Sequence, residues 1–391
     1  MRRFLVLCAA LCGIAHAETV LVLPFFNHSK STNLDWIGES IAETVHDALV
    51  SEGLLALDRE DRLEAYRRLN LRPGAELTHA SIIKIGQVLD ASRVVYGDFD
   101  LQPAEQGKDQ SKGTLRINAR ILDLKDTRQG PPFSELGALE DLAAIEVRLG
   151  WQSLQQLIPK SAPAEQEYVR SRPRVRLDAV ESYIRGLLAT APEQRYKLFT
   201  QSARLDEHYS QPCYQLGKIA WDQKDYKGAA TWLARVGKTD PHYLESQFFL
   251  GLSQYHQGSY AAAEQQFQTV ATSVPLNEVF NNLGAAQSRR NDTAGAIASF
   301  RKALEGDSAD PDYHFNLGYE LWKSGQFDAA VESLRAAVAR NASDTEATSL
   351  LGFALKQQGP RQNDPKSEGR ERLKLNYDEA AYRQLQAELK K

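Results

Sequence analysis

The chain has 391 residues, with 47 Lys and Arg against 51 Asp and Glu and a formal net charge of −4. At roughly 150 residues per domain, this length predicts two or three folding units and excludes a single small core. The near-neutral charge gives no long-range positive field that would attract a phosphate backbone, so the composition argues against a nucleic-acid partner.

The first residues have the pattern of a secretory signal peptide. Residues 1–3 are basic at the start, residues 4–15 are apolar, and Ala15-His16-Ala17 places small residues where signal peptidase reads the chain. We expect cleavage after Ala17, a mature chain that begins at Glu18, and a periplasmic or secreted protein with no stable membrane span. The alternative is a signal that is retained as an anchor. Cleavage would leave Cys213 as the only thiol, so no internal disulfide could form.

The amino-terminal part has the alternating pattern of an α/β domain with a small mixed sheet. Apolar and β-branched runs predict strands over 20–26, 54–57, 94–99 and 115–124. Helical spacing predicts a helix that is capped by Ser31 or Asn33 and ends near Gly53, followed by helices over 59–69 and 78–89. Residues 103–113 are polar and predict an exposed hairpin loop.

Three motifs in this part carry a family resemblance. They are Val22-Leu23-Pro24-Phe25-Phe26-Asn27, the run from Leu34 to Ser40 that includes Trp36 and Gly38, and Ala91 to Phe99 with its Tyr-Gly-Asp. Residues 18–128 resemble the TolB amino-terminal-like domains, which are related to the envelope proteins FlgO and CsgG. The resemblance implies a module for assembly and protein contact in the bacterial cell envelope, often joined to helical repeats.

Residues 129–176 are expected to connect the two halves of the chain. Helical spacing predicts a helix over 139–157, and the proline-containing stretch 159–173 predicts a linker. A degenerate repeat unit is expected over 177–209, because Tyr183, Gly186, Phe199 and Ala203 fit the register of the units that follow.

The carboxy-terminal half is an internal repeat array. A Leu-Gly pair recurs with its glycines at 217, 251, 284, 318 and 352, at intervals of 34, 33, 34 and 34 residues. Alanines at 229, 263, 296 and 330 and bulky residues at 233, 267, 300 and 334 keep the same register. Small residues let two helices approach closely, so each unit reads as an antiparallel helix pair, helix A then helix B.

This pattern resembles the tetratricopeptide repeat (TPR) over residues 210–358, which predicts an all-α solenoid after the α/β domain. Residues 359–370 break the pattern with Gly, Pro and polar residues, and 378–389 read as a charged amphipathic helix. We expect this last helix to cap the exposed end of the solenoid.

The strongest candidate site is the concave groove that helices A are expected to line. In peptide-binding TPR proteins an Asn before the Leu-Gly pair bonds to the ligand backbone, and Asn282 and Asn316 match that place. The resemblance thus implies a peptide or protein partner, and neutral or mixed ligand chemistry because a Lys-rich clamp does not appear. The groove positions predicted from the register are Tyr214, Lys218, Trp221, Phe248, Leu252, Tyr255, Asn281, Asn282, Arg289, Phe315, Asn316, Tyr319, Trp322 and Lys323.

No catalytic or metal-binding motif is found in the sequence, and we expect no cofactor, no metal and no catalytic residue. Glu43, His46 and Asp47 could support a metal, but a solvated helix face explains them with less. Cys213 falls at a repeat core position, which predicts a buried structural thiol. The sequence therefore favours a non-enzymatic, exported interaction scaffold of the cell envelope. The alternatives are a structural subunit that oligomerises through the α/β domain, and an enzyme of unrecognised type.

Overall fold

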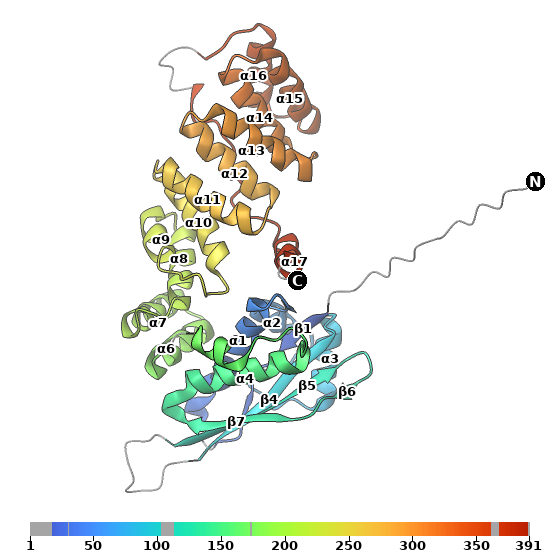
Figure 1. Cartoon of the computed structure of the whole chain (residues 1–391), viewed down its shortest axis with the longest axis vertical. Coiled ribbons are helices and arrows are strands. Elements are labelled where there is room, and N and C mark those ends of the chain that lie inside the picture. Colours follow the sequence, from blue (N-terminus) through green and yellow to red (C-terminus); the bar gives the residue numbers. More distant parts are fainter. Residues whose placement is uncertain (1–17, 30, 103–112, 173, 361–366, 390–391) are drawn as a thin grey trace, which may run out of the picture.

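The computed structural model describes residues 18–29, 31–102, 113–172, 174–360 and 367–389. The predicted signal peptide and most of the predicted loop 103–113 lie outside these residues. An α/β domain stands at one end of the molecule, and a stack of helix pairs rises from it (Figure 1). Both parts of the predicted fold class are confirmed.

The α/β domain is built on a seven-stranded mixed sheet in the order β3-β1-β4-β5-β6, with β2 on β4 and β7 on β5. The pairs β1–β3, β1–β4 and β2–β4 are parallel, and those made by β5 are antiparallel. The strands are β1 Thr19–Val22, β2 Phe26–Asn27, β3 Leu55–Ala56, β4 Arg93–Gln102, β5 Thr114–Asp123, β6 Arg128–Gln129 and β7 Phe133–Ala138.

Helices cover both faces of this sheet. On one face, α1 (Trp36–Ser51) and α4 (Leu142–Leu157) share a core with Val20, Val22 and Val95. On the other face, α2 (Arg59–Arg68) and α3 (His79–Val88) pack on Leu21 and Val94. Successive residues of β1 thus serve opposite cores, as the alternation of side chains along a strand requires.

The predicted strand 20–26 is interrupted. Pro24 has no N–H to give to a ladder, and the amide of Phe25 instead donates to the carbonyl of Gly38 at 3.1 Å. A Cβ on Gly38 would collide with the carbonyl oxygen of Phe25, so the close crossing of this segment over α1 requires glycine there.

The domain also extends beyond the expected boundary at residue 128. Strand β7 pairs with β5 over six residue pairs, and α4 packs against α1. The predicted linker contains a short helix, α5 (Glu165–Arg170), and is anchored by the indole of Trp151, which donates to the carbonyl of Pro163 at 2.9 Å. Residues 133–157 thus pack as part of the α/β domain, and the predicted linker that follows is itself packed against α4.

The array consists of helix pairs, and every register glycine before Gly352 lies against a bulky residue of the following helix. A Cβ on Gly186, Gly251 or Gly284 would lie 2.5–2.8 Å from the ring of Phe199, Phe267 or Phe300. The helices are α6 Leu177–Leu188, α7 Pro192–Leu205, α8 Gln211–Asp222, α9 Tyr226–Leu233, α10 Tyr243–His256, α11 Tyr260–Ser273, α12 Asn277–Arg289, α13 Thr293–Gly306, α14 Pro311–Lys323, α15 Phe327–Arg340 and α16 Thr345–Leu355.

The last helix, α17 (Glu379–Leu389), does not cap the exposed end of the array. Residues 367–377 run down the stack, and α17 lies beside the α/β domain (Figure 1). There α17 contacts β3, and Arg383 forms an ion pair with Asp58. The expected capping role is therefore wrong, because apolar residues of α17 pack against the core where the array meets the α/β domain.

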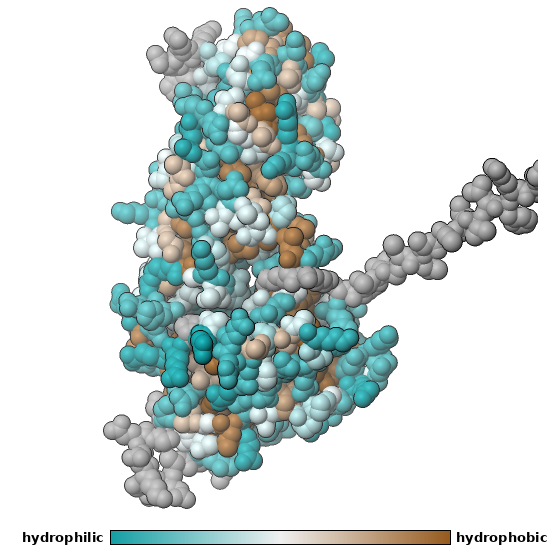
Figure 2. All heavy atoms as spheres, in the orientation of Figure 1, coloured by the Kyte–Doolittle hydropathy of each residue, from teal (hydrophilic) through white to brown (hydrophobic). Residues whose placement is uncertain are grey.

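The surface view agrees with a hydrophilic exterior. On the face shown in Figure 2, hydrophilic residues predominate and hydrophobic ones are scattered among them. Among the described helices, none combines the length and the apolar character that a membrane crossing requires.

Candidate functional site

The face of the array formed by helices A is occupied by the chain itself. Residues 367–377, here called the carboxy-terminal segment, run along α14, then α12, then α10 toward the α/β domain. The phenol of Tyr319 in α14 donates to the carbonyl of Ser367 at 2.8 Å. At the other end, the ring of Tyr377 packs edge-on against Phe248 in α10, with centroids 5.1 Å apart.

Two asparagines one repeat apart hold the backbone of this segment, and each one bonds both the N–H and the C=O of a single residue. The amide of Asn316 donates to the carbonyl of Arg372 at 2.8 Å, and its oxygen accepts from the N–H of Arg372 at 2.8 Å. Asn282 does the same at Lys374, at 2.7 and 2.8 Å. Asn281 adds a bond to the carbonyl of Arg372 at 2.8 Å. These contacts recognise the backbone of the segment and not its side chains.

Arg372 and Lys374, two of the three basic residues of the segment, meet carboxylates at the starts of helices α14 and α16. Arg372 contacts both carboxylate oxygens of Asp344, at 2.6 and 3.0 Å, and also Asp312 at 3.1 Å. Lys374 lies 2.7 Å from Asp310 and 2.8 Å from Asp312. Since Arg372 and Lys374 are two residues apart in an extended chain, both side chains point to this one side.

The guanidinium of Arg372 is also stacked on an aromatic ring. Its carbon lies 3.5 Å from the centroid of Phe315, which is fully buried. A desolvated cation on an aromatic face is worth about 2 kcal/mol. The hydrogen bonds from Arg372 lower the pKa of the Asp344 carboxyl, so this pair is charged at neutral pH.

Glu371, one of the two acidic residues of the segment, points the other way, into a polar cluster between α12 and α14. The hydroxyl of Ser288 lies 2.7 Å from Glu371 and 2.6 Å from the fully buried Glu320. The ammonium of Lys323 lies 3.0 Å from Glu320 and 2.9 Å from the Ser288 oxygen. A hydroxyl has one hydrogen to donate, so Lys323 supplies the positive charge that lets both carboxylates face Ser288.

The predicted groove residues divide into three groups. Those that contact the carboxy-terminal segment are Phe248, Tyr255, Asn281, Asn282, Phe315, Asn316 and Tyr319. Trp322, Lys323 and Arg289 flank it: the indole of Trp322 donates to the carbonyl of Gln358, and Arg289 lies beside Gly369.

The remaining predicted residues lie apart from the segment or below the surface. Trp221 packs in the seam among Tyr226, Phe249 and His256, and Leu252 is fully buried. Tyr214 and Lys218 line a cavity of about 470 Å³ that α17 and the α/β domain share with the array. The register placed these four on the helix A side, but helix packing turns Trp221 and Leu252 inward.

The junction with the α/β domain is held by charged and polar contacts. His46 in α1 lies between Asp47 and Asp58, 3.4 Å from each. Burial opposes its protonation, but the hydrogen bonds to these two carboxylates raise the pKa of His46 to about 10. The ion pair of Asp58 with Arg383 connects α17 to the same cluster. Asp47 also accepts from the amide of Gln211 in α8, so His46 and Asp47 belong to an interdomain contact, whereas Glu43 pairs with Arg62 of α2 at 3.6 Å.

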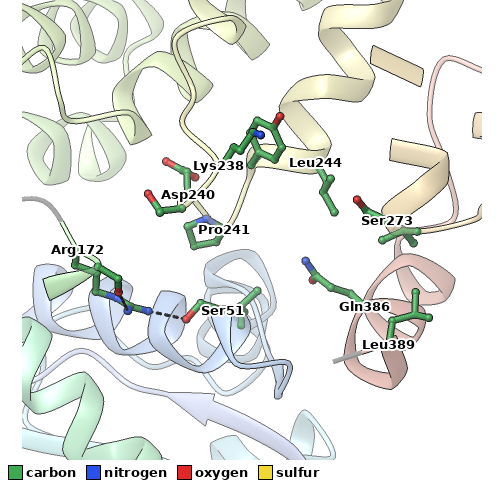
Figure 3. Close-up of a pocket in the computed structure, with 14 residues that line it drawn as sticks. Ser51, Arg172, Lys238, Asp240, Pro241, Leu244, Ser273, Gln386 and Leu389 are labelled. Carbon is green, nitrogen blue, oxygen red and sulfur yellow. Dashed lines mark hydrogen bonds between the residues drawn. The ribbon is translucent and has the colours of Figure 1, made fainter. Parts of the chain in front are cut away.

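A second cavity lies beneath α17. It has a volume of about 570 Å³ and is lined by α1, the 238–244 turn and the end of α17. Figure 3 shows Arg172 reaching toward Ser51 below the cavity, at 2.7 Å, and Gln386 and Leu389 facing it from α17. The packing between α17 and the rest of the molecule is therefore incomplete.

Cys213 is fully buried in α8, and burial raises the pKa of its thiol to about 11. A thiol in that state is a poor nucleophile. Within the described residues, no three His, Cys, Asp or Glu side chains are grouped as a metal site would need.

Sequence reasoning missed Ser288, Glu320 and the acidic residues at the helix starts. A signal for the acidic residues was present: Asp310 and Asp344, and likewise Asp312 and Glu346, are 34 residues apart, which is the repeat period. They resemble ordinary helix amino-terminal caps, and Asp310 and Asp344 do accept bonds from amides of their helices. The single sequence gave no reason to assign them a ligand as well.

Two tetratricopeptide-repeat family models match residues 214–278 and 289–359. These residues are tetratricopeptide repeats, and the predicted resemblance is confirmed for them. Neither match extends to the α/β domain, whose resemblance to TolB amino-terminal-like domains stays a prediction. The comparison with curated proteins finds no match.

Solved structures with similarity to part of the chain include two of MamA and one of YrrB. MamA from Desulfovibrio magneticus is 22% identical, with 41% of this chain and 92% of that chain covered and a TM-score of 0.37. Another MamA structure is 20% identical, covering 39% and 84%, with a TM-score of 0.36. YrrB, described as a TPR protein with an unusual peptide-binding site, is 17% identical, covering 44% and 87%, with a TM-score of 0.36.

Proposed function

We propose that this protein is a non-enzymatic interaction scaffold whose helix A face binds an extended polypeptide segment of a partner. The observation that carries the proposal is the pair of two-point contacts that Asn316 and Asn282 make with the backbone of Arg372 and Lys374. A side chain that satisfies both the N–H and the C=O of one residue suits any extended chain. Each such bond contributes about 0.5–1.5 kcal/mol.

The buried state of these asparagines supports the same proposal. Asn281, Asn282 and Asn316 are fully buried beneath the segment, and buried amides without partners are costly. When the carboxy-terminal segment leaves, the amides need water or another polypeptide in its place. A partner segment that restores the five hydrogen bonds of these asparagines is the natural replacement.

We further propose that the scaffold works in the bacterial cell envelope after export. The signal pattern of residues 1–17 and the resemblance of residues 18–128 to TolB amino-terminal-like domains support this location. In this proposal the α/β domain supplies the envelope contact and the array supplies the partner contact.

Affinity capture from an envelope extract tests the binding role. The full chain is compared with the double variant Asn282→Ala/Asn316→Ala and with the matched control Asn341→Ala, an exposed asparagine after α15. We expect the control to retain a specific set of partners that the double variant loses by tenfold or more. Equal capture by all three proteins, with loss only when the α/β domain is altered, would assign binding to that domain.

A further inference from the structure

The charges of the carboxy-terminal segment match those of the helix A face one by one. Around Arg372 and Lys374 the face presents Asp310, Asp312, Asp344 and Glu346, four carboxylates within 3.3 Å of the two cations. The face is therefore strongly acidic at this end whenever the segment is absent.

Around Glu371, one residue earlier in the segment, the helix A face is instead positively charged. Glu371 contacts Ser288 and lies 3.4 Å from the phenol of Tyr255. Lys323 and Arg289 border this cluster and outnumber the buried carboxylate of Glu320. A carboxylate at this place thus restores local neutrality, where a second cation would not.

The segment is also held in a way that permits exchange. Leu375, between the basic pair and the α17 end, is 51% exposed, and a cavity of about 570 Å³ lies beneath α17. Most of the contacts that carry specificity are hydrogen bonds and ion pairs to one short stretch, residues 371–374. A competing polypeptide with the same pattern could make all of them.

We infer that the helix A face recognises partner segments with the pattern acidic–basic–any–basic, and that residues 371–374, Glu-Arg-Leu-Lys, are an internal copy that such a partner displaces. This inference rests on the proposed function and adds the ligand chemistry and the competition. Backbone bonds to Asn282 and Asn316 fix the register, and the alternating charges select the sequence.

Covalent attachment makes the internal copy a strong competitor. A tethered segment on a short connection reaches an effective concentration on the order of millimolar. If the same sequence binds as a free peptide with a Kd of about 10 μM, the internal copy reduces its apparent affinity about a hundredfold. Removing the internal copy from the helix A face should therefore raise the affinity for the free peptide by about the same hundredfold.

The test uses a fluorescent synthetic peptide with the sequence of residues 367–378 and the full-length protein. Peptide binding is measured by anisotropy to the wild type and to Arg372→Glu/Lys374→Glu, whose own segment is repelled by the acidic face. We expect the variant to bind the peptide at least tenfold tighter than the wild type. Arg372→Gln/Lys374→Gln is a milder second variant, and circular dichroism verifies folding of both.

Peptide controls separate charge recognition from backbone recognition. A peptide with Arg372→Glu and Lys374→Glu should bind the opened protein at least a hundredfold more weakly, whereas Leu375→Ala, at an exposed position, should bind normally. Equal binding of the charge-reversed peptide, or equal affinity of wild type and variant, overturns this inference and leaves the proposed function standing.

Two other outcomes have different meanings. Limited chymotrypsin digestion reports whether the segment has left the face, because its sites at Leu373, Leu375 and Tyr377 are the same in the wild type and in both variants. If it has left and no peptide binds, the proposed function itself fails. Light scattering tests whether the face binds the segment of a second copy of this chain. A wild-type dimer that dissociates in Arg372→Glu/Lys374→Glu would assign the face to that second copy and overturn the inference of a different partner protein.

Discussion

The contact of each repeat glycine with the following helix can be tested by a matched pair of substitutions. Gly284 and Gly352 occupy the same position of their helices A. A Cβ on Gly284 would lie 2.7 Å from Cε1 of Phe300, which is fully buried, whereas a Cβ on Gly352 would meet nothing within 4 Å. The same change, Gly→Ala, thus meets a rigid ring in one case and open space in the other.

The expected changes in the free energy of unfolding have opposite signs at the two positions. Alanine in place of a helical glycine gains about 0.8–1.0 kcal/mol in helix propensity at both positions. At Gly284 the contact is about 1 Å shorter than the optimum of about 3.5–4.0 Å, and overpacking of this kind costs about 1–3 kcal/mol. We expect Gly352→Ala to stabilise by about 0.5–1 kcal/mol and Gly284→Ala to destabilise by about 1–2 kcal/mol.

Urea unfolding followed by far-ultraviolet circular dichroism measures both free-energy changes under one condition. Because repeat arrays can lose cooperativity, amide hydrogen exchange in α12 and α13 is measured as well. It should increase for Gly284→Ala alone. If both variants shift stability in the same direction by the same amount, the close approach is not what places glycine in this register.

Three other predictions concern titration and processing. Burial raises the pKa of Glu146 to about 8, above its unfolded value, so the cost of folding with this carboxyl protonated grows as pH rises from about 4.5 to 8. Glu146→Gln should therefore stabilise by about 4 kcal/mol at pH 8 and by about 1 kcal/mol or less at pH 5. Urea midpoints measure the difference, and a pH-independent difference would contradict this. The pKa of His46 in the folded protein is raised to about 10, so its contribution to folding stability is complete below about pH 6.5 and is lost toward pH 10. The stability advantage of the wild type over His46→Gln should therefore shrink between pH 7 and 10. A constant advantage would refute the ion-pair role. Intact mass of the exported protein should correspond to a chain that begins at Glu18, and retention of residues 1–17 would indicate an anchor.

The repeat array was predictable because its determinants are local and periodic. Gly284 meets Phe300 sixteen residues later, and Gly251 meets Phe267 at the same interval. Such contacts recur at each unit, so one sequence carries several copies of the signal. The same register placed Asn282 and Asn316 on the helix A side, where the structure has them.

The path of the carboxy-terminal segment could not be predicted in this way. Lys374 meets Asn282 at a separation of 92 residues, and Arg383 meets Asp58 at 325. No period relates these pairs, and a charged amphipathic helix after a solenoid has the composition of a cap. Strand β7 was missed for a related reason: it is short and contains Gly137, and only its pairing with β5 defines it.

The docking of the last residues of the chain also sets an order of events during biosynthesis. Translation proceeds from the amino terminus, so residues 367–377 are made after every helix of the array that they contact. Contacts that span 92 and 325 residues form late, because each must first close a long loop. The newly made array therefore passes through a stage with its helix A face uncovered. During that stage the proposed competition between its own segment and a partner segment is decided by rate rather than by affinity.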